Sequence, residues 1–156
     1  MVITWEEYFM GVAILSSYRS KDPNTKVGAC IVNQDKKIVS LGYNGFPISK
    51  TDNDKTYPWE REGNPLDTKY PYVVHAELNA ILNSRADLRN CTIYVTLFPC
   101  NECCKAIIQS GIKEMVYLSN KYADSDSTKA SVKMLDNAGI VCIQYTPSGK
   151  NINLEI

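Results

Sequence analysis

Residues 91–119, Cys-Thr-Ile-Tyr-Val-Thr-Leu-Phe-Pro-Cys-Asn-Glu-Cys-Cys-Lys-Ala-Ile-Ile-Gln-Ser-Gly-Ile-Lys-Glu-Met-Val-Tyr-Leu-Ser, contain the pattern that decides the fold. The apolar run Cys91–Leu97 predicts a strand. Pro99 then opens a helix, which stops at Gly111, a residue type that commonly follows a helix C-terminus. The apolar run Glu114–Ser119 predicts the next strand. Because a strand, a helix and a strand follow one another directly, we expect two parallel neighbours joined by a crossover.

The rest of the chain extends this unit on both sides. The remaining predicted elements are a helix at Trp5–Tyr18 capped by Thr4, strands at Lys26–Val32 and Lys37–Gly42 that form an antiparallel hairpin, a helix at Val73–Asn83, a helix at Ser127–Asn137 and a strand at Ile140–Tyr145. We therefore expect an α/β fold, a three-layer α/β/α sandwich with a five-stranded mixed sheet whose first pair is antiparallel.

Composition narrows the class of protein. With 156 residues, 44% hydrophobic and 22% charged, the chain is predicted to be one domain, 1–156. Its 17 basic and 17 acidic residues cancel, which favours a small phosphorylated partner over a polynucleotide. No leader or membrane span is evident, so we expect a cytoplasmic protein with reduced thiols.

The polar, unpatterned stretch from Pro47 to Tyr70 predicts a functional loop.

Two cysteines at the start of the predicted 99–110 helix indicate a metal site. Cys100 and Cys103 lie three residues apart on one helix face, and the helix dipole favours their thiolate forms. Thiolates together with imidazole favour zinc. A redox pair, half of a four-cysteine structural site and ordinary core cysteines are the alternatives. Cys104, four residues after Cys100, competes with Cys103 as a ligand.

His75 is the only histidine of the chain, and two residues after it stands Glu77. Together with Pro99-Cys100-Asn101-Glu102-Cys103 these residues form the H-x-E…P-C-x-x-C signature of zinc deaminases. Residues two apart on a helix point about 200° away from each other, so both can reach one ion only at the helix N-terminus. We expect His75, Cys100 and Cys103 to hold zinc, with water in the fourth position, and Glu77 to transfer protons.

Several separate blocks closely resemble deoxycytidylate (dCMP) deaminases, members of the cytidine and deoxycytidylate deaminase superfamily. They are residues 19–29 (Arg-Ser-Lys-Asp-Pro-Asn-Thr-Lys-Val-Gly-Ala), 42–47 (Gly-Tyr-Asn-Gly-Phe-Pro), 66–77 (Leu-Asp-Thr-Lys-Tyr-Pro-Tyr-Val-Val-His-Ala-Glu) and 98–103 (Phe-Pro-Cys-Asn-Glu-Cys). The resemblance runs from about residue 5 to about residue 145. It implies a cytidine deaminase-like fold and hydrolytic deamination of dCMP to dUMP and ammonia, which feeds thymidylate synthesis.

The same resemblance implies partners and further site residues. Members of this family commonly form homohexamers that are activated by dCTP and inhibited by dTTP with Mg²⁺. By resemblance, the substrate-binding residues are Asn44 at the deoxyribose, Arg19, Lys121 and Tyr122 near the 5′-phosphate, and Ala76, while the allosteric residues are Gly42, Tyr43 and Gly45. A guanidinium suits phosphate because its donors form a planar fork.

Two other functions share parts of this pattern. A tRNA adenosine or polynucleotide cytidine deaminase would carry the same zinc motif, although the neutral charge and the dCMP-type blocks argue against it. A zinc-stabilised interaction module without catalysis would use the same ligands only to hold its fold. An open fourth position and the presence of Glu77 favour catalysis.

Overall fold

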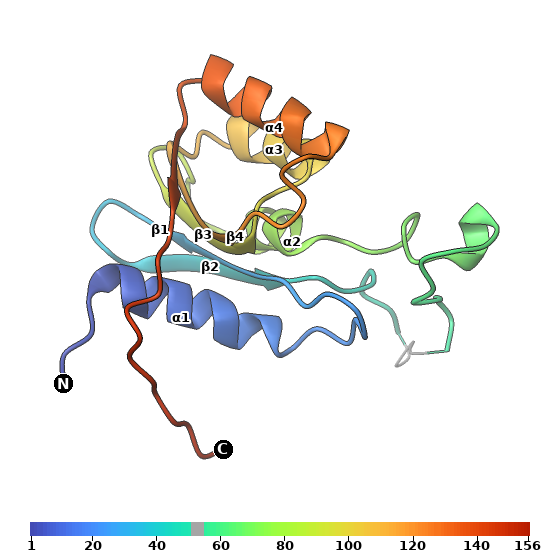
Figure 1. Cartoon of the computed structure of the whole chain (residues 1–156), viewed down its shortest axis with the longest axis horizontal. Helices are drawn as coiled ribbons and strands as arrows, with labels where there is room; N and C mark the ends of the chain where they lie inside the picture. The colour runs from blue at the N-terminus through green and yellow to red at the C-terminus, as the bar shows by residue number, and fades with distance from the viewer. Residues whose placement is uncertain (51–54) are drawn as a thin grey trace.

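The computed structural model describes residues 1–50 and 55–156, and within them one sheet lies between two layers of helices (Figure 1). The elements are α1 (Trp5–Ser17), β1 (Gly28–Val32), β2 (Ile38–Tyr43), a short 3-10 helix η1 (Pro65–Asp67), α2 (Ala76–Asn83), β3 (Thr92–Leu97), α3 (Asn101–Gln109), β4 (Glu114–Ser119), α4 (Asp126–Asn137) and β5 (Val141–Gln144). The strand order is β2-β1-β3-β4-β5. β1 runs antiparallel to β2 and β3, whereas β3, β4 and β5 are parallel. The predicted α/β/α sandwich with a five-stranded mixed sheet is confirmed.

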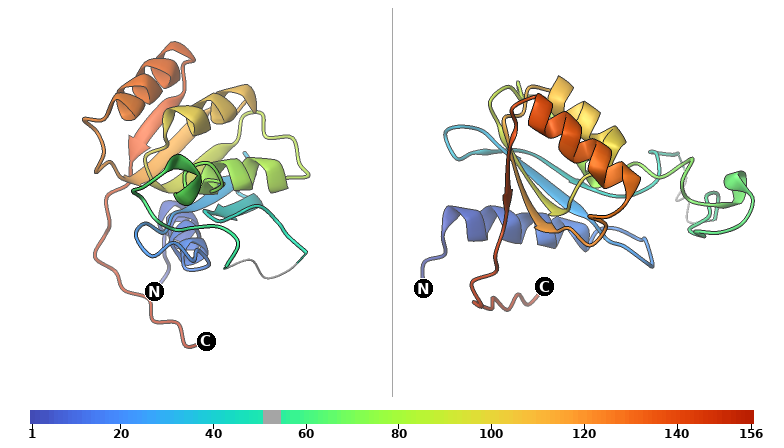
Figure 2. Two further views of the ribbon diagram at one scale, coloured as in Figure 1. Left: turned by 90° about the vertical axis from the view of Figure 1, so that its right-hand side faces the viewer. Right: turned by 45° about the horizontal axis from the view of Figure 1, so that its top comes forward.

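Each face of the sheet has its own core. α1 covers one face, where Phe9, Met10 and Ala13 pack against Cys30 and Tyr94. α2, α3 and α4 lie on the opposite side, as Figures 1 and 2 show from three directions. Successive residues of a strand point to opposite faces, and every residue of β1 is buried, so β1 contributes to both cores. The buried residues of the second core include Ala29, Ile31, Ile93, Val95, Ile107 and Met115.

Two helices begin later than the sequence predicts. The helix expected from Val73 begins at Ala76, because Val74 pairs with Gly45 in an isolated antiparallel bridge and keeps the preceding chain extended. His75 is the N-cap residue of this helix. The helix expected from Pro99 begins at Asn101, and Cys100 is its N-cap residue. Both candidate ligands therefore lie at the junction between an extended segment and a helix N-terminus.

Gly42 lets α2 approach the sheet closely. A Cβ atom at this position would lie 2.2 Å from the carbonyl oxygen of Ala76 and 2.5 Å from the backbone nitrogen of Ala80. Both atoms belong to the backbone and cannot rotate away. The absence of a side chain at Gly42 thus allows the first turn of α2 to pack closely against β2. Gly42 has this packing role in addition to the allosteric role predicted from the resemblance.

Gly42→Ala is expected to lower the free energy of unfolding by about 1–3 kcal/mol, because the added methyl group must displace α2. Gly11→Ala is the matched control, since a Cβ at Gly11 in α1 meets nothing within 4 Å. There alanine should raise the free energy of unfolding by about 0.5–1 kcal/mol through its higher helix propensity. Denaturant titration measures both changes, and an unaltered Gly42→Ala midpoint would contradict the close approach.

An arm formed by residues 55–72 extends from the body of the fold (Figure 1, right). Phe46 lies 4.0 Å from Trp59 and 5.1 Å from Tyr57, measured between ring centroids, and Tyr57 in turn lies 5.1 Å from Tyr72. This aromatic cluster joins the arm to the chain that follows β2. The predicted loop 47–70 includes residues 51–54, which lie outside the described residues.

Nowhere in the described ranges is there a helix with the length and apolar character of a membrane span.

Candidate metal centre and active site

Three potential ligand atoms converge where α2 and α3 begin. His75 Nδ1 lies 3.4 Å from Cys100 Sγ and 3.5 Å from Cys103 Sγ. All three ligand atoms fall within 4.8 Å of one another. Cys100 precedes α3 and Cys103 belongs to its first turn, so one helix start supplies both thiols. The chain thus brings together two segments that are separated by β3.

These separations fit a zinc ion. With Zn–N near 2.0–2.1 Å and Zn–S near 2.3 Å, a tetrahedral ion holds nitrogen and sulfur ligands about 3.6 Å apart. Among the residues that the structure describes, the group has three members, His75, Cys100 and Cys103. Three protein ligands are the pattern of a catalytic zinc site, in which the fourth position is left for water or substrate.

Cys104 lies outside this group. It is fully buried on the flank of α3, and its Sγ is 3.9 Å from the carbonyl oxygen of Pro99. Burial raises the pKa of this thiol to about 12. The Cys104 sulfur is not among the ligand atoms that converge with His75 Nδ1. The geometry therefore favours Cys103 over Cys104 as the third ligand.

The local electrostatics prepare a thiolate at Cys100. A hydrogen bond from the Cys103 thiol lowers the pKa of Cys100 to about 4; burial opposes this shift, and a hydrogen bond with His75 adds to it. The same bond raises the pKa of Cys103. The backbone N–H of Cys103 also points at Cys100 Sγ, at 3.5 Å. A bound cation would stabilise both thiolates at once.

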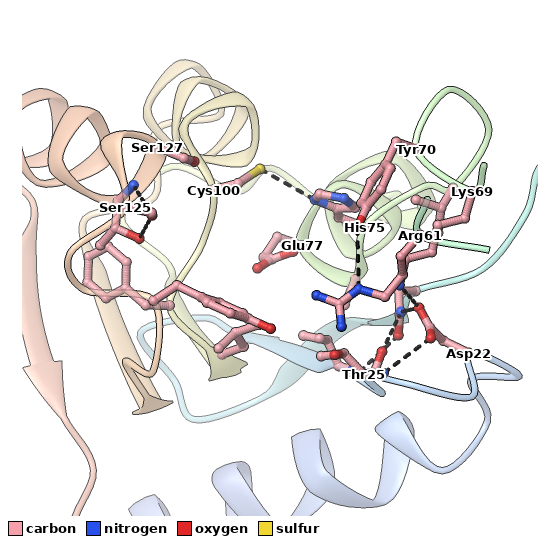
Figure 3. Close-up of a pocket in the computed structure, with 18 residues that line it drawn as sticks. Asp22, Thr25, Arg61, Lys69, Tyr70, His75, Glu77, Cys100, Ser125 and Ser127 are labelled. Atoms are coloured by element: carbon pink, nitrogen blue, oxygen red, sulfur yellow. Dashed lines mark hydrogen bonds and ion pairs between the residues drawn. The ribbon is translucent and has the colours of Figure 1, made fainter. Parts of the chain in front are cut away.

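Glu77 lies beside the ligands without joining them. Its side chain is 4% exposed and points into the pocket next to Cys100 and His75 (Figure 3). Burial raises the pKa of this carboxyl group, which lets it hold a proton more readily than an exposed glutamate. Because His75 is the N-cap and Glu77 the second residue of α2, both reach the same site, as the geometric condition from the sequence requires.

A pocket of about 320 Å³ opens in front of these residues (Figure 3). Its lining residues are Asp22, Thr25, Val27, Asn44, Arg61, Lys69, Tyr70, Val73, His75, Ala76, Glu77, Leu97, Phe98, Cys100, Tyr122, Ser125, Ser127 and Thr128. Three of the predicted substrate-binding residues, Asn44, Ala76 and Tyr122, are among them. This volume is within the range of small-molecule sites.

Other predicted residues lie elsewhere. Arg19 stacks over the ring of Tyr43, 5.7 Å from its centroid, and Lys121 lies 5.1 Å from the ring centroid of Tyr122. Neither Arg19 nor Lys121 lines the pocket. The predicted allosteric residues also lie outside it: Gly45 bridges to Val74, and the carbonyl of Tyr43 accepts a hydrogen bond from Asn79. Their predicted roles rest on the resemblance.

The sequence interpretation missed eight polar residues of the pocket, namely Asp22, Thr25, Arg61, Lys69, Tyr70, Ser125, Ser127 and Thr128. Three of them come from the arm or its base. The length of the predicted loop indicated a functional segment, but its sequence has no period from which the inward-facing side chains could be read. At Asp22 the sequence indicates only a turn.

Residues 3–119 match the model of the cytidine and deoxycytidylate deaminase zinc-binding region. The match includes the pocket residues up to Cys100 and the complete ligand group. The chain belongs to the cytidine and deoxycytidylate deaminase family. This agrees with the resemblance inferred from the sequence blocks, and it makes the chain an enzyme of the deaminase class.

Members of this deaminase family resemble the chain over nearly its whole length. The human protein named deoxycytidylate deaminase is 52% identical over 155 residues, covering 98% of this chain and 86% of its own. The mouse deoxycytidylate deaminase is 53% identical with the same coverage. The dCMP deaminase of cyanophage S-TIM5, solved in complex with dCMP and dUMP, is 27% identical with a TM-score of 0.72, covering 93% of this chain and 99% of that one.

Proposed function

We propose that this chain is a zinc-dependent dCMP deaminase, which converts dCMP and water to dUMP and ammonia. The observation that carries the proposal is the group His75, Cys100 and Cys103 with the buried carboxyl of Glu77 beside it in one pocket. The full-length similarity to proteins named deoxycytidylate deaminase supports the substrate. So does the similarity to a phage enzyme solved with dCMP and dUMP.

The chemistry requires a nucleophilic hydroxide at C4, a proton at N3 and a proton for the leaving amine. Zinc held by His75, Cys100 and Cys103 would supply hydroxide near neutral pH by lowering the pKa of bound water towards about 7. Glu77 accepts the proton of the water and delivers it to N3. It then assists proton transfer to the amino group as the C4–N4 bond breaks, so the products are a carbonyl at C4 and ammonia.

Ultraviolet monitoring of amine loss tests the function directly. Purified protein would be assayed with dCMP, CMP, deoxycytidine, dCTP and a single-stranded oligonucleotide. We expect the highest kcat/KM with dCMP, together with about one zinc ion per chain. Activity confined to the oligonucleotide would instead identify a polynucleotide deaminase, and zinc without any activity would identify a structural module.

Arg61 is the pocket residue best suited to the 5′-phosphate. It comes from the arm, its guanidinium points into the pocket in Figure 3, and its Nε lies 3.5 Å from the hydroxyl of Tyr70. Tyr122 lines the same pocket. We include Arg61 with the predicted phosphate residues Arg19, Lys121 and Tyr122, because a guanidinium fork matches phosphate oxygens.

Arg61→Ala should raise KM for dCMP about tenfold or more, because a charge-assisted contact with the phosphate is lost. KM for deoxycytidine should change little, since that substrate has no phosphate. Arg19→Ala provides the matched comparison from outside the pocket lining. Steady-state kinetics with both substrates distinguishes them: equal losses with dCMP and deoxycytidine, or a larger effect at Arg19, would refute the assignment of the phosphate to Arg61.

Regulation and assembly are further parts of the proposal. By resemblance, we propose a cytoplasmic homohexamer, formed by single-domain chains, that dCTP activates and dTTP inhibits, with Mg²⁺ bound to the effector and with Gly42, Tyr43 and Gly45 at the effector site. Velocity plotted against dCMP should then be sigmoidal and become hyperbolic with dCTP. Hyperbolic kinetics that neither nucleotide alters would remove the regulatory part, and light scattering would measure the assembly.

A further inference from the structure

A buried ion pair forms part of the wall of the pocket. Lys69 Nζ lies 2.5 Å from Asp22 Oδ2, and the side chains of Lys69 and Asp22 are 9% and 1% exposed. Burial by itself would raise the pKa of Asp22, but the hydrogen bond from Lys69 and those from the backbone N–H groups of Asn24 and Thr25 outweigh it, so the pKa is lowered. Asp22 is therefore an ionised acceptor inside the protein.

Asp22 and two backbone groups near it orient the side chain of Asn44. The Asn44 Oδ1 accepts from the backbone N–H of Val27 at 2.9 Å, and its Nδ2 donates to the carbonyl of Thr25 at 2.9 Å and to Asp22 Oδ2 at 3.4 Å. These partners define which end of the amide is oxygen, because a backbone N–H can only donate and a carboxylate can only accept. Both N–H donors of Asn44 are occupied, and one lone pair of Oδ1 is left for the pocket.

Lys69 connects this wall to the metal ligands. Its backbone N–H donates to the carbonyl of Glu60, and its own carbonyl accepts from Tyr72 at 3.0 Å and Val73 at 2.9 Å. Lys69 thus fastens the arm to the segment that leads into His75, while its ammonium group holds Asp22. Lys69 therefore connects Asp22, which binds Asn44, to the segment that carries the metal ligand His75.

We propose that Asp22 and Lys69 are positioning residues that fix Asn44 as a hydrogen-bond acceptor for the 3′-hydroxyl of the bound deoxynucleotide. This inference rests on the proposed function, because it takes a deoxynucleotide as the occupant of the pocket. A hydroxyl is the donor that a deoxyribose offers, and the free lone pair of Asn44 Oδ1 is its complement. Asp22 and Lys69 act through Asn44 and need not touch the substrate.

Asp22→Asn tests the proposal. Its amide oxygen can still accept from Asn24 and Thr25, but its NH₂ then faces the NH₂ of Asn44 and the ammonium of Lys69. The Asn44 amide loses a partner that fixes its orientation. We compare dCMP with 2′,3′-dideoxy-CMP, which lacks the hydroxyl, and expect the wild-type preference in kcat/KM for dCMP to fall about tenfold in the variant, the effect of one hydrogen bond.

Further variants distinguish a loss of substrate preference from a loss of stability. Lys69→Met leaves a buried carboxylate unpaired and should lower the melting temperature by on the order of 10 °C. The double variant Asp22→Asn/Lys69→Met should regain most of that temperature without regaining the preference for dCMP. Asp87→Asn is the matched control, because it removes the carboxylate of an exposed pair with Arg89 and should change neither quantity.

Each outcome has a defined meaning. A smaller preference with zinc content retained supports the positioning role. Equal losses with both nucleotides, a preference that the double variant restores, or a wild-type enzyme that does not distinguish them would overturn it. A wild-type protein that binds zinc but deaminates neither nucleotide would overturn the proposed function instead, so the two failures are distinguishable.

Discussion

Replacing Glu77 by glutamine is expected to lower kcat for dCMP by at least ~100-fold, the lower end of the contribution of a general acid-base group. Glutamine has nearly the same shape but cannot accept and deliver the proton that moves from water to N3. The fold and the zinc content should persist. Burial already raises the pKa of Glu77, so exchanging this carboxyl for a neutral amide removes an unfavourable buried charge.

Glu102→Gln is the control for this variant. Glu102 lies in the first turn of α3, close in sequence to both cysteines, but its side chain is 73% exposed and pairs with Lys105. The same chemical change there should leave kcat within a few-fold. Stopped-time assays of ammonia release, with zinc measured on the same samples, provide the comparison. Near-normal turnover by the Glu77→Gln protein would refute its proton-transfer role.

Replacing Cys100 or Cys103 by serine is expected to remove zinc and, with it, activity. A serine hydroxyl is a poor zinc ligand at neutral pH, so the affinity for zinc should fall by more than the ~10–100-fold that follows loss of an outer-shell partner. Zinc per chain after dialysis, measured by mass spectrometry, gives the result. Full zinc in the Cys103→Ser protein would show that the ligand assignment is wrong.

Cys104→Ser is the informative comparison, because it tests the alternative left open by the sequence. This residue follows Cys100 by four positions, about one helical turn, yet its Sγ faces the carbonyl of Pro99. Zinc should stay at the wild-type level in this variant. A hydroxyl can keep the contact to Pro99, so we expect a stability change of only about 1 kcal/mol.

Much of the fold follows from short-range patterns. β4 matches its predicted bounds because an apolar run is set between a turn glycine and polar residues, and the crossovers determine that β3, β4 and β5 are parallel. The start of α2 was misplaced because Val73 and Val74 have no local signal that separates them from the helix. Their extended conformation depends on pairing with Gly45, a contact distant in sequence.

Some residues of the candidate site could likewise be predicted from short-range patterns, and others could not. The ligand group could be predicted because the chain has a single histidine and because two cysteines three residues apart lie on one face of a helix. Arg61 and Lys69 could not be predicted, because their positions depend on how the arm folds against the pocket. Lys69 pairs with Asp22, from which it is separated by 47 positions in the sequence. Pairings of that length leave no periodic trace in the sequence.

The placement of His75 and Cys100 as N-cap residues has a consequence for how freely this enzyme can change. The metal site is built from the first residues of α2 and α3, so the remaining turns of both helices contribute support and no ligand. We therefore expect substitutions at exposed positions near their C-terminal ends, where buried core residues such as Ala80 and Ile107 are kept, to leave the metal ligands in place. A designer could therefore rebuild those ends, for example as a new binding face, while the deaminase chemistry stays intact.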